Sequence, residues 1–399
     1  MRTDRLAILS VFAITAGGCG GGVSGGPPSV AAIVVSPDSL LLDVGVTRQL
    51  VATAVDAHGS QVTGVVMAFA SADTAIATST NAGAVTGRRG GRTTVRASSG
   101  SITTDVPVAV RARPHLIKTQ IAIPARPFGA AVSSLGVAYV TQQDADAITR
   151  VSLATLAVTG TVPVGRDPGD VAFTSSGTTA YVTNFIAGTL GKVDVGTGIQ
   201  TATVPLGGDA YRVLVSRDDA RVLVTSGNGT LQIRQAGNLA LLSTIVVGAT
   251  PNGIASLGDT MLYVSSASTG TIREVDLRTG AVRRTLPVGG VPQDIALSQD
   301  GRQLFMADET RGVVVVSLAS GTVTATVPTT SRAFGLGLGP DGWLYVTLPD
   351  VGSVVVVDPL QPVIAGTVAV GGQPRRVAFD SHGTAVLITN EGGWVDVLR

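Results

Sequence analysis

The sequence predicts an all-β protein with two parts, a small β-sandwich followed by a seven-bladed β-propeller. Three observations lead to this prediction. The chain has 51 Gly in 399 residues and only 14% charged side chains, a composition typical of short strands joined by tight turns. Apolar and polar residues alternate between frequent turn signals from 31 to 112. Similar units then follow one another from 114 to 399.

The first nineteen residues have the features of an export signal. Arg2 and Arg5 precede an apolar run from Leu6 to Ala16, which small residues and Cys19 follow. As a helix this run would span about 16 Å, well short of the roughly 30 Å hydrocarbon core of a bilayer. We therefore expect a secretory signal over 1–19 rather than a membrane-spanning helix. Because Cys19 is the only cysteine, a disulfide within the chain is excluded.

The small residues before Cys19 resemble the end of a bacterial lipoprotein signal. This resemblance implies acylation of Cys19, although Ala16 stands where such signals usually carry Leu. The alternative is an ordinary signal peptide that is cleaved nearby and releases the protein. Residues 20–30 are rich in Gly and Pro and should form a flexible linker. We expect an exported protein of the outer membrane, periplasm or cell surface that touches the membrane only through a lipid anchor.

Residues 31–112 carry at least six short strand candidates at the spacing of a β-sandwich. In order, the stretches "VVSP" at 34, "LDVG" at 42, "QLVA" at 49 and "GAVTG" at 83 resemble a bacterial Ig-like domain of group 2. Phe69 departs from that family, which commonly has a core Trp at this position. The resemblance implies a spacer, and we expect this domain to act as a stalk.

The rest of the chain is built from seven similar units. A Pro or Ala precedes the first strand of each unit, and these residues lie 41 or 42 positions apart: Pro127, Pro168, Ala210, Pro251, Pro292, Ala333 and Pro374. Each unit contains an apolar strand, a Gly turn and a second strand such as "YVTN" at 181. Third and fourth strands such as "TIREVDL" and "VRRTLPVGG" complete the unit. Four strands per unit of about 41 residues predict the blades of a β-propeller.

The second strands of the units resemble the YVTN-type β-propeller repeat, which implies a seven-bladed ring over 114–399. The chain ends on the third strand of the last unit, and the segment before Pro127 looks like a fourth strand without a unit of its own. We therefore expect strand 118–124 to pair with the C-terminal strand 394–399 and to close the ring.

The mouth of the central channel should be ringed by the two residues after each aligned Pro or Ala. Those with suitable side chains form a candidate binding rim of Phe128, Asp170, Tyr211, Arg212, Asn252, Gln293, Asp294, Phe334, Arg375 and Arg376. In the outer connections we expect flanking residues at Asn184, Phe185, Asp308, Glu309, Arg311, Asp350, Asn390 and Glu391. The alternative is that opposite charges neutralise each other and the aromatic rings plug the channel.

Catalytic chemistry has little support in the sequence. His58, His115 and His382 fall in separate parts of the predicted fold, so they cannot form a general acid–base set. Asp170 and Asp294 share the predicted ring with two arginines, which would repel a metal ion. We expect no catalytic residue, no metal and no cofactor.

The expected function is therefore binding. The net charge is +1 and the basic residues are scattered, which argues against nucleic acid. We expect a monomer whose propeller face takes a protein, peptide or glycan ligand. Lactonase and lyase relatives share the architecture, so one alternative is an enzyme of that type with a site at the channel mouth. A purely structural envelope component is the other.

Overall fold

The computed structural model describes residues 29–112, 114–380 and 383–399, and the expected signal and Cys19 lie outside them. The chain divides into two compact units. The larger contains Leu41–Val46, Gly87–Gly91 and Ala109–Arg399, and the smaller contains Thr47–Thr86, Arg92–Val108 and the described part of Met1–Leu40. No helix in the described ranges has the length and apolar character needed to cross a bilayer.

Nine strands form from the N-terminal part of the described chain. They are β1 (Ala32–Ser36), β2 (Leu40–Asp43), β3 (Thr47–Gln49), β4 (Val51–Val55), β5 (Ala68–Ser71), β6 (Ala77–Ser79), β7 (Ala84–Gly87), β8 (Gly91–Ser99) and β9 (Ile102–Arg111). Their sheets have the orders β1-β4, β2-β9-β8-β5 and β3-β7-β6. Side chains alternate between buried and exposed along β1 and along the end of β9, and Phe69 is buried in β5. This alternation is the two-residue period of a strand with one face in a core.

Residues 118–399 form seven four-stranded sheets, which we call ring sheets 1 to 7. Ring sheet 1 contains β11 (Pro127–Val132), β12 (Val137–Gln142), β13 (Ala147–Ser152) and β14 (Ala157–Pro163). Ring sheet 2 contains β15 (Pro168–Phe173), β16 (Thr179–Asn184), β17 (Thr189–Asp194) and β18 (Ile199–Pro205). Ring sheet 3 contains β19 (Ala210–Val215), β20 (Arg221–Ser226), β21 (Thr230–Gln235) and β22 (Leu241–Val246). Ring sheets 4 and 5 contain β23 (Gly253–Leu257), β24 (Met261–Ser266), β25 (Thr271–Asp276), β26 (Ala281–Pro287); and β27 (Pro292–Leu297), β28 (Gln303–Asp308), β29 (Gly312–Ser317), β30 (Thr322–Val327).

The last two ring sheets are less regular. Ring sheet 6 contains β31 (Leu336–Leu338), β32 (Leu344–Leu348), β33 (Ser353–Asp358) and β34 (Val363–Ala369). Ring sheet 7 contains β35 (Pro374–Phe379), β36 (Val386–Asn390), β37 (Trp394–Leu398) and β10 (Lys118–Ala122). Two short 3-10 helices, η1 (Gln143–Ala145) and η2 (Pro349–Val351), lie between second and third strands. Shortening of β31 leaves a longer connection before it, and Phe334 lies in that connection.

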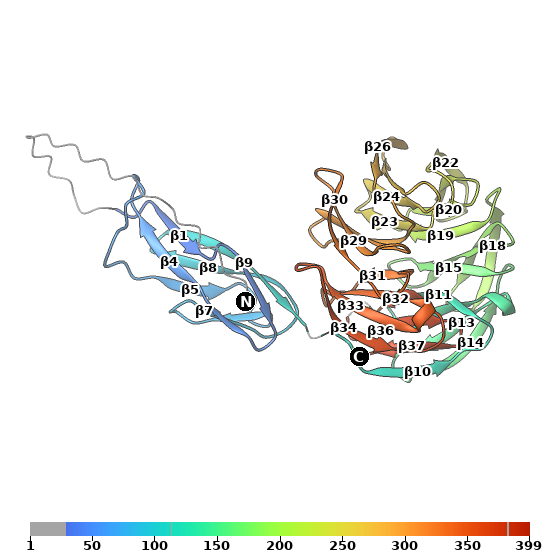
Figure 1. Cartoon of the computed structure of the whole chain (residues 1–399), viewed down its shortest axis with the longest axis horizontal. Helices are drawn as coiled ribbons and strands as arrows, with labels where there is room; N and C mark the ends of the chain where they lie inside the picture. Colours follow the sequence, from blue (N-terminus) through green and yellow to red (C-terminus); the bar gives the residue numbers. More distant parts are fainter. Residues whose placement is uncertain (1–28, 113, 381–382) are drawn as a thin grey trace, which may run out of the picture. The chain divides into compact units, whose positions relative to one another are not determined.

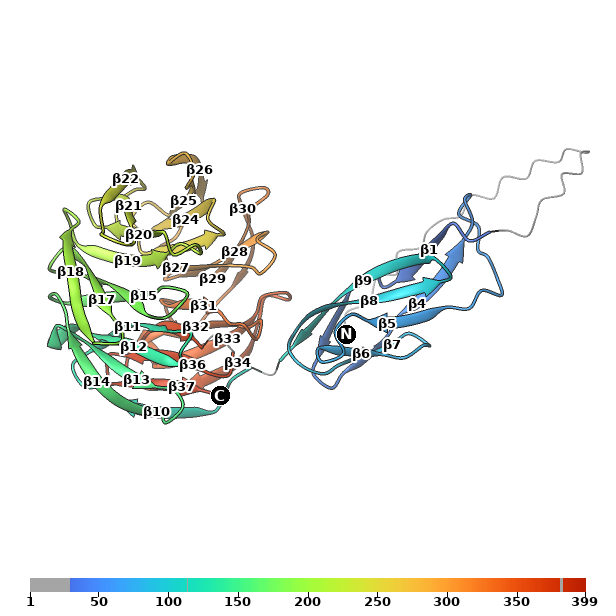
Figure 2. The same ribbon diagram turned by 180° about the vertical axis from the view of Figure 1, so that it is seen from behind.

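The seven sheets form a closed ring. The first strand of each sheet contacts the first strand of the next, in the order β11, β15, β19, β23, β27, β31 and β35, and β35 contacts β11 again. Figures 1 and 2 show first strands such as β11, β15 and β31 inside the ring, with β14, β18, β22, β26, β30 and β34 at its periphery. Each sheet packs between two neighbours, so second strands such as β12 and β16 are buried on both faces, whereas fourth strands such as β14 and β18 stay largely exposed. The fold is propeller-like and all-β, as the sequence predicts.

The two ends of the ring come together in ring sheet 7. β10 pairs antiparallel with β37 from Lys118 opposite Leu398 to Ala122 opposite Trp394, and Figures 1 and 2 show the two strands side by side. Ile121 of β10 and Val395 of β37 belong to the same buried cluster. Strand β10 therefore occupies the fourth-strand position that β37 leaves open, and it is shorter than the expected 118–124.

Two residues of the "YVTN" stretch in β16 link ring sheet 2 to ring sheet 3. Tyr181 is 1% exposed, and its hydroxyl donates a hydrogen bond to the backbone oxygen of Ala236 in ring sheet 3 at 2.7 Å. Thr183 is fully buried, and its hydroxyl donates to the backbone oxygen of Tyr211 at 3.1 Å. Both bonds run from ring sheet 2 to its neighbour. The recurring Thr thus ties adjacent sheets together beside the channel mouth.

Candidate binding site

A cavity of about 310 Å³ lies where the connections into the first strands meet the connections that follow the second strands. Antiparallel strands alternate in direction, so these two kinds of connection lie at the same end of every ring sheet. The cavity is lined by Arg126, Phe128, Gln143, Asp167, Gly169, Phe185, Ala210, Tyr211, Asn252, Gln293, Phe334, Arg376 and Glu391. Its volume is near the lower end of the roughly 300–1,000 Å³ typical of small-ligand sites.

The structure separates the ten residues of the candidate rim into two groups. Those that line the cavity are Phe128, Tyr211, Asn252, Gln293, Phe334 and Arg376. Those outside its lining are Asp170, Arg212, Asp294 and Arg375. All six lining residues except Arg376 directly follow an aligned Pro or Ala, whereas Asp170, Arg212 and Asp294 stand one residue further on. Except in the last unit, where Arg375 lies outside the lining and Arg376 within it, the two positions of the repeat therefore differ in role.

The residues at the second position form a buried ionic cluster. Asp294 is 3% exposed and lies between two guanidinium groups, with Arg376 at 3.0 Å and Arg212 at 3.5 Å. Arg212 also lies 3.4 Å from the carboxylate of Asp170, which accepts a hydrogen bond from the backbone N–H of Val213. Two carboxylates and two guanidinium groups compensate each other's charge. These contacts agree with the alternative expectation from the sequence, in which opposite charges at the channel mouth neutralise each other.

Burial affects the acid–base properties of the ionic cluster. It raises the pKa of Asp170, against the opposing effects of Arg212 and Arg376. Burial and, second, the neighbouring charge of Arg212 lower the pKa of Arg376 to about 10. Arg376 therefore stays protonated at neutral pH and holds its ion pair with Asp294.

Glycine occupies the second position in the sheets that do not contribute to the ionic cluster. A Cβ on Gly129 would lie 2.3 Å from the backbone oxygen of Gly169, and one on Gly335 would lie 1.9 Å from that of Arg375. Both distances are far below any real contact, so the backbones of neighbouring sheets exclude a side chain here. In these sheets the first strands approach each other too closely for a side chain at the second position. The ionic cluster is therefore built only from the sheets that carry Asp or Arg there.

Aromatic rings and arginines form the layer above the ionic cluster. Phe128 and Phe334 pack edge to face with ring centroids 6.1 Å apart. The guanidinium carbons of Arg375 and Arg376 lie 4.9 Å and 5.0 Å from the centroid of the Phe334 ring, within the range of cation–π attraction. Arg375 also pairs with Glu391 at 2.8 Å. The three residues Phe128, Phe334 and Arg375 are only partly buried.

On the other side of the lining, Phe185 and Tyr211 form a second edge-to-face pair at 5.2 Å. Next to Tyr211 along the ring, Asn252 donates a hydrogen bond to Gln293 at 2.6 Å. Gln293 in turn donates to Glu309 at 2.8 Å. These two hydrogen bonds hold the side chains of Asn252, Gln293 and Glu309 in place relative to one another.

Five lining residues are absent from the expected rim and from its flanking set: Gly169, Ala210 and the three with polar side chains, Arg126, Gln143 and Asp167. Arg126 and Asp167 each directly precede an aligned Pro, and Gln143 follows the second strand as Phe185 does in the next unit. The repeat therefore contains the signal for them, at the positions before the Pro and after the second strand. Curvature of the connections, visible in the positive φ of 52° at Arg126 and 56° at Asp167, brings them to the cavity.

Several residues expected to flank the rim are buried instead. Asn184, Asp308 and Asn390 end their second strands and are each fully buried. Asp308 and Asn390 bind backbone groups of adjacent connections, and Asn184 donates a hydrogen bond to the hydroxyl of Thr189 at 3.0 Å. Asn390, for example, accepts hydrogen bonds from the backbone N–H groups of Gln373 and Gly392. These residues are unavailable to a ligand, and their role is to shape the connections.

The histidines do not assemble a catalytic site in the part of the chain that the structure describes. His58 is exposed in a turn. His115 contacts the backbone oxygen of Gly383 at 2.9 Å and lies 3.8 Å from Asp341, away from the cavity lining. His382 lies outside the described residues. Within the described ranges, His, Cys, Asp and Glu side chains form no group of three or more suited to a metal ion.

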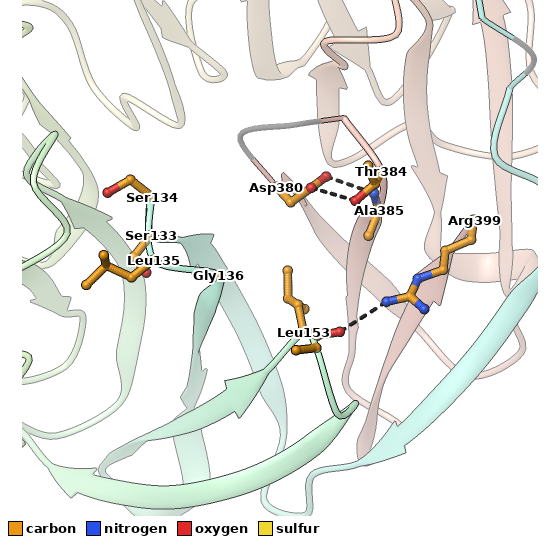
Figure 3. A pocket seen from close by; sticks show the side chains of 10 residues that line it. Ser133, Ser134, Leu135, Gly136, Leu153, Asp380, Thr384, Ala385 and Arg399 are labelled. Carbon is orange, nitrogen blue, oxygen red and sulfur yellow. Dashed lines mark hydrogen bonds between the residues drawn. The ribbon is translucent and has the colours of Figure 1, made fainter.

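Figure 3 shows a second cavity, of about 410 Å³, at the opposite end of ring sheets 1 and 7. Its polar groups are used internally. Arg399 donates to the backbone oxygen of Leu153 at 3.1 Å, and Asp380 accepts hydrogen bonds from Thr384 and from the backbone N–H of Ala385. The first cavity, which we call the channel-mouth cavity, is lined by four aromatic side chains. The second cavity has no aromatic residue in its lining. We therefore take the channel-mouth cavity as the candidate site.

Seven four-stranded sheets in a closed ring, with a cavity at one end of it, define the class of the larger unit as propeller-like. A chain of the hydrazine synthase structure from Kuenenia stuttgartiensis is similar to this structure, with a TM-score of 0.64 and 17% sequence identity. The match covers 70% of this chain and 97% of that chain. At this identity the likeness shows the fold alone. No family model and no curated protein matches the sequence.

Proposed function

We propose that this protein is an exported, lipid-anchored component of the bacterial cell envelope that presents a non-catalytic propeller as a binding platform. In this proposal Cys19 carries the anchor, the Ig-like segment 31–112 is a stalk, and the YVTN-type ring over 114–399 binds a ligand. The channel-mouth cavity is the single observation that carries the binding role.

The lining of that cavity has the composition of a recognition site. It combines partly exposed aromatic side chains with amides and with charged groups at its edge, the mixture of apolar surface and a few polar groups that binds small ligands. The nearby charges are held in ion pairs, as between Arg376 and Asp294. Paired charges and hydrogen-bonded amides favour a rigid surface that binds over a site that moves protons.

A binding assay with the full chain tests this proposal. The protein is titrated with cell-envelope extracts, peptide libraries and glycan arrays, and we expect saturable binding. Tyr211→Ala and Phe334→Ala each remove an aromatic ring from the cavity and should weaken binding about tenfold or more. The control Leu241→Ala removes an apolar side chain that is 53% exposed on the peripheral strand β22 and should leave binding unchanged.

Two other outcomes would replace the proposal. Hydrolysis or elimination of a defined substrate that is lost in Asp170→Asn or Asp294→Asn would identify an enzyme of lactonase or lyase type. Absence of saturable binding to every fraction would favour a purely structural envelope component.

A further inference from the structure

We propose that the channel-mouth cavity binds the terminal sugar ring of a glycan, and that this sugar is a neutral hexose or N-acetylhexosamine. This inference rests on the proposed function, because it names the ligand class of the same site. Three properties of the cavity support it: its aromatic lining, its unsatisfied polar atoms and the internal balance of its charge.

The aromatic lining suits the apolar face of a pyranose. Phe185 and Tyr211 form one edge-to-face pair and Phe128 and Phe334 form another, and all four contribute to the lining. An aromatic face is electron-rich, so it attracts the weakly positive C–H groups that line one side of a sugar ring. Four rings around a cavity of about 310 Å³ leave room for a terminal sugar, in contrast to an extended peptide, which needs an open groove or sheet edge.

The polar atoms of the lining call for a ligand that both donates and accepts hydrogen bonds. Asn252 Oδ1 and Asp167 Oδ1 are buried acceptors without a hydrogen-bond partner among the described residues. Arg376 Nε is a buried donor that is likewise unsatisfied within the described chain. Buried polar atoms are normally paired. Hydroxyl groups satisfy both kinds of atom because each one donates and accepts.

The charges at the cavity favour a neutral ligand. Arg376 is paired with Asp294 at 3.0 Å, and Glu391 is paired with Arg375 at 2.8 Å. Arg126 lies 3.3 Å from Asp144, and its charge also acts on Asp167, the remaining carboxylate of the lining, against the effect of burial, which raises the pKa of that group. An anionic or cationic ligand would have to compete with these partners, whereas a neutral sugar leaves them intact. Uncharged hexoses and N-acetylhexosamines are therefore favoured over uronic acids, sulfated sugars and charged peptides.

The test measures binding of the full chain to methyl glycosides and disaccharides of neutral hexoses and N-acetylhexosamines. Uronic acids, sulfated sugars and a peptide library are measured alongside them. We expect saturable binding of a neutral sugar that weakens about tenfold or more in Phe185→Ala and in Asn252→Ala. The matched controls are Ile186→Ala, in the same connection as Phe185, and Asn228→Ala, in a neighbouring connection; both residues lie outside the lining. Each control should change the affinity less than about twofold.

The outcomes separate the inference from the proposed function. If only peptides bind, and Phe185→Ala abolishes that binding, the platform stands and the sugar class is wrong. Preference for uronic or sulfated sugars would overturn the neutral ligand. Neutral-sugar binding that both cavity variants leave unchanged would place the sugar elsewhere and overturn the site. If no probe binds, the proposed function fails together with the inference. Thermal unfolding of each variant shows whether it is folded.

Discussion

The buried Thr of the second strands shows how one residue type holds the ring together. Thr225 accepts a hydrogen bond from the backbone N–H of Arg212 in its own sheet and donates one to the backbone oxygen of Pro251 in the next, both at 3.0 Å. Ser265 does the same for Gly253 and Gln293. A hydroxyl is the smallest side-chain group that can serve both partners. Ring sheet 5 has Ala307 at this position.

Replacing this hydroxyl should destabilise the ring. Thr225→Val keeps the shape of the side chain but leaves the N–H of Arg212 and the carbonyl of Pro251 without their partner. A buried polar group that loses its hydrogen-bond partner costs about 1–3 kcal/mol. We expect a loss of that size in the free energy of unfolding measured with urea. Thr159→Val is the matched control, since Thr159 is exposed and its bond to Arg150 is 3.3 Å long. Equal stability of the two variants would contradict the role assigned to Thr225.

At the scale of elements, the connections at the channel mouth are ordered by the residues that end the second strands. Asp308 ends β28 and accepts hydrogen bonds from the backbone N–H groups of Thr310 and Arg311 and from the guanidinium of Arg311. It also accepts one from the backbone N–H of Val291, just before β27. One carboxylate thus fixes the connection that leaves β28 and the connection that enters β27. Their shape places Gln293 in the cavity lining and Glu309 within hydrogen-bond distance of Gln293.

The contribution of Asp308 should depend on pH. Burial opposes ionisation, but the hydrogen bonds from Arg311 and Thr310 outweigh it and lower the pKa of Asp308. A lowered folded-state pKa stabilises the fold above the unfolded value of about 3.9, and that stability is lost as the pH falls through the folded value. Asp308→Asn should therefore be less stable than the natural protein at pH 7, and the difference should shrink in acid.

Urea unfolding of both proteins between neutral and acidic pH measures this difference. Asp209→Asn is the control, because Asp209 is exposed in the connection between β18 and β19 and its replacement removes the same charge. A stability difference for Asp308→Asn that stays constant down to the lowest pH would show that its carboxylate charge does not stabilise the connections.

For the whole molecule, closure of the ring depends on residues from both ends of the larger unit. β37 lies between β36 and β10 in ring sheet 7, and its Val395 and Val397 are fully buried. Asp396 of β37 is also fully buried and accepts hydrogen bonds from Gln120 of β10 and from Trp394. Loss of β37 would separate the two ends, and every other sheet would lose the constraint of a closed ring.

Deleting Trp394–Arg399 should therefore abolish cooperative unfolding of all seven ring sheets. The measurement is thermal unfolding followed by circular dichroism, with tryptophan fluorescence of Trp343 as a probe in ring sheet 6. Deleting Arg399 alone is the comparison, since it keeps β37 intact and removes only the hydrogen bonds of Arg399 with Leu153 and Ile117. If the longer deletion unfolded at the same temperature as the full chain, pairing between β10 and β37 would have no part in holding the ring closed.

What can be derived from the sequence is what depends on local pattern. Alternation with a period of two predicts strands, and the repeated Pro, Gly turn and "YVTN" strand predict a series of four-stranded units; the structure shows both. The residues after several aligned Pro residues, such as Phe128, Asn252 and Gln293, were also identifiable as positions that line the cavity, whereas Arg375 after Pro374 lies outside it. These predictions succeed because each depends on residues close together in the chain.

Only the tertiary structure decided which of those residues a ligand can reach. Asp294 and Asn252 occupy nearby positions of similar units, yet Asp294 is enclosed by Arg212 and Arg376 from two other sheets, while Asn252 lines the cavity. Sequence spacing gives the order of the sheets around the ring, but it does not give which side chains meet across the channel. Those contacts arise only when the ring closes, because closure brings together residues more than 80 positions apart, such as Asp294 and Arg376.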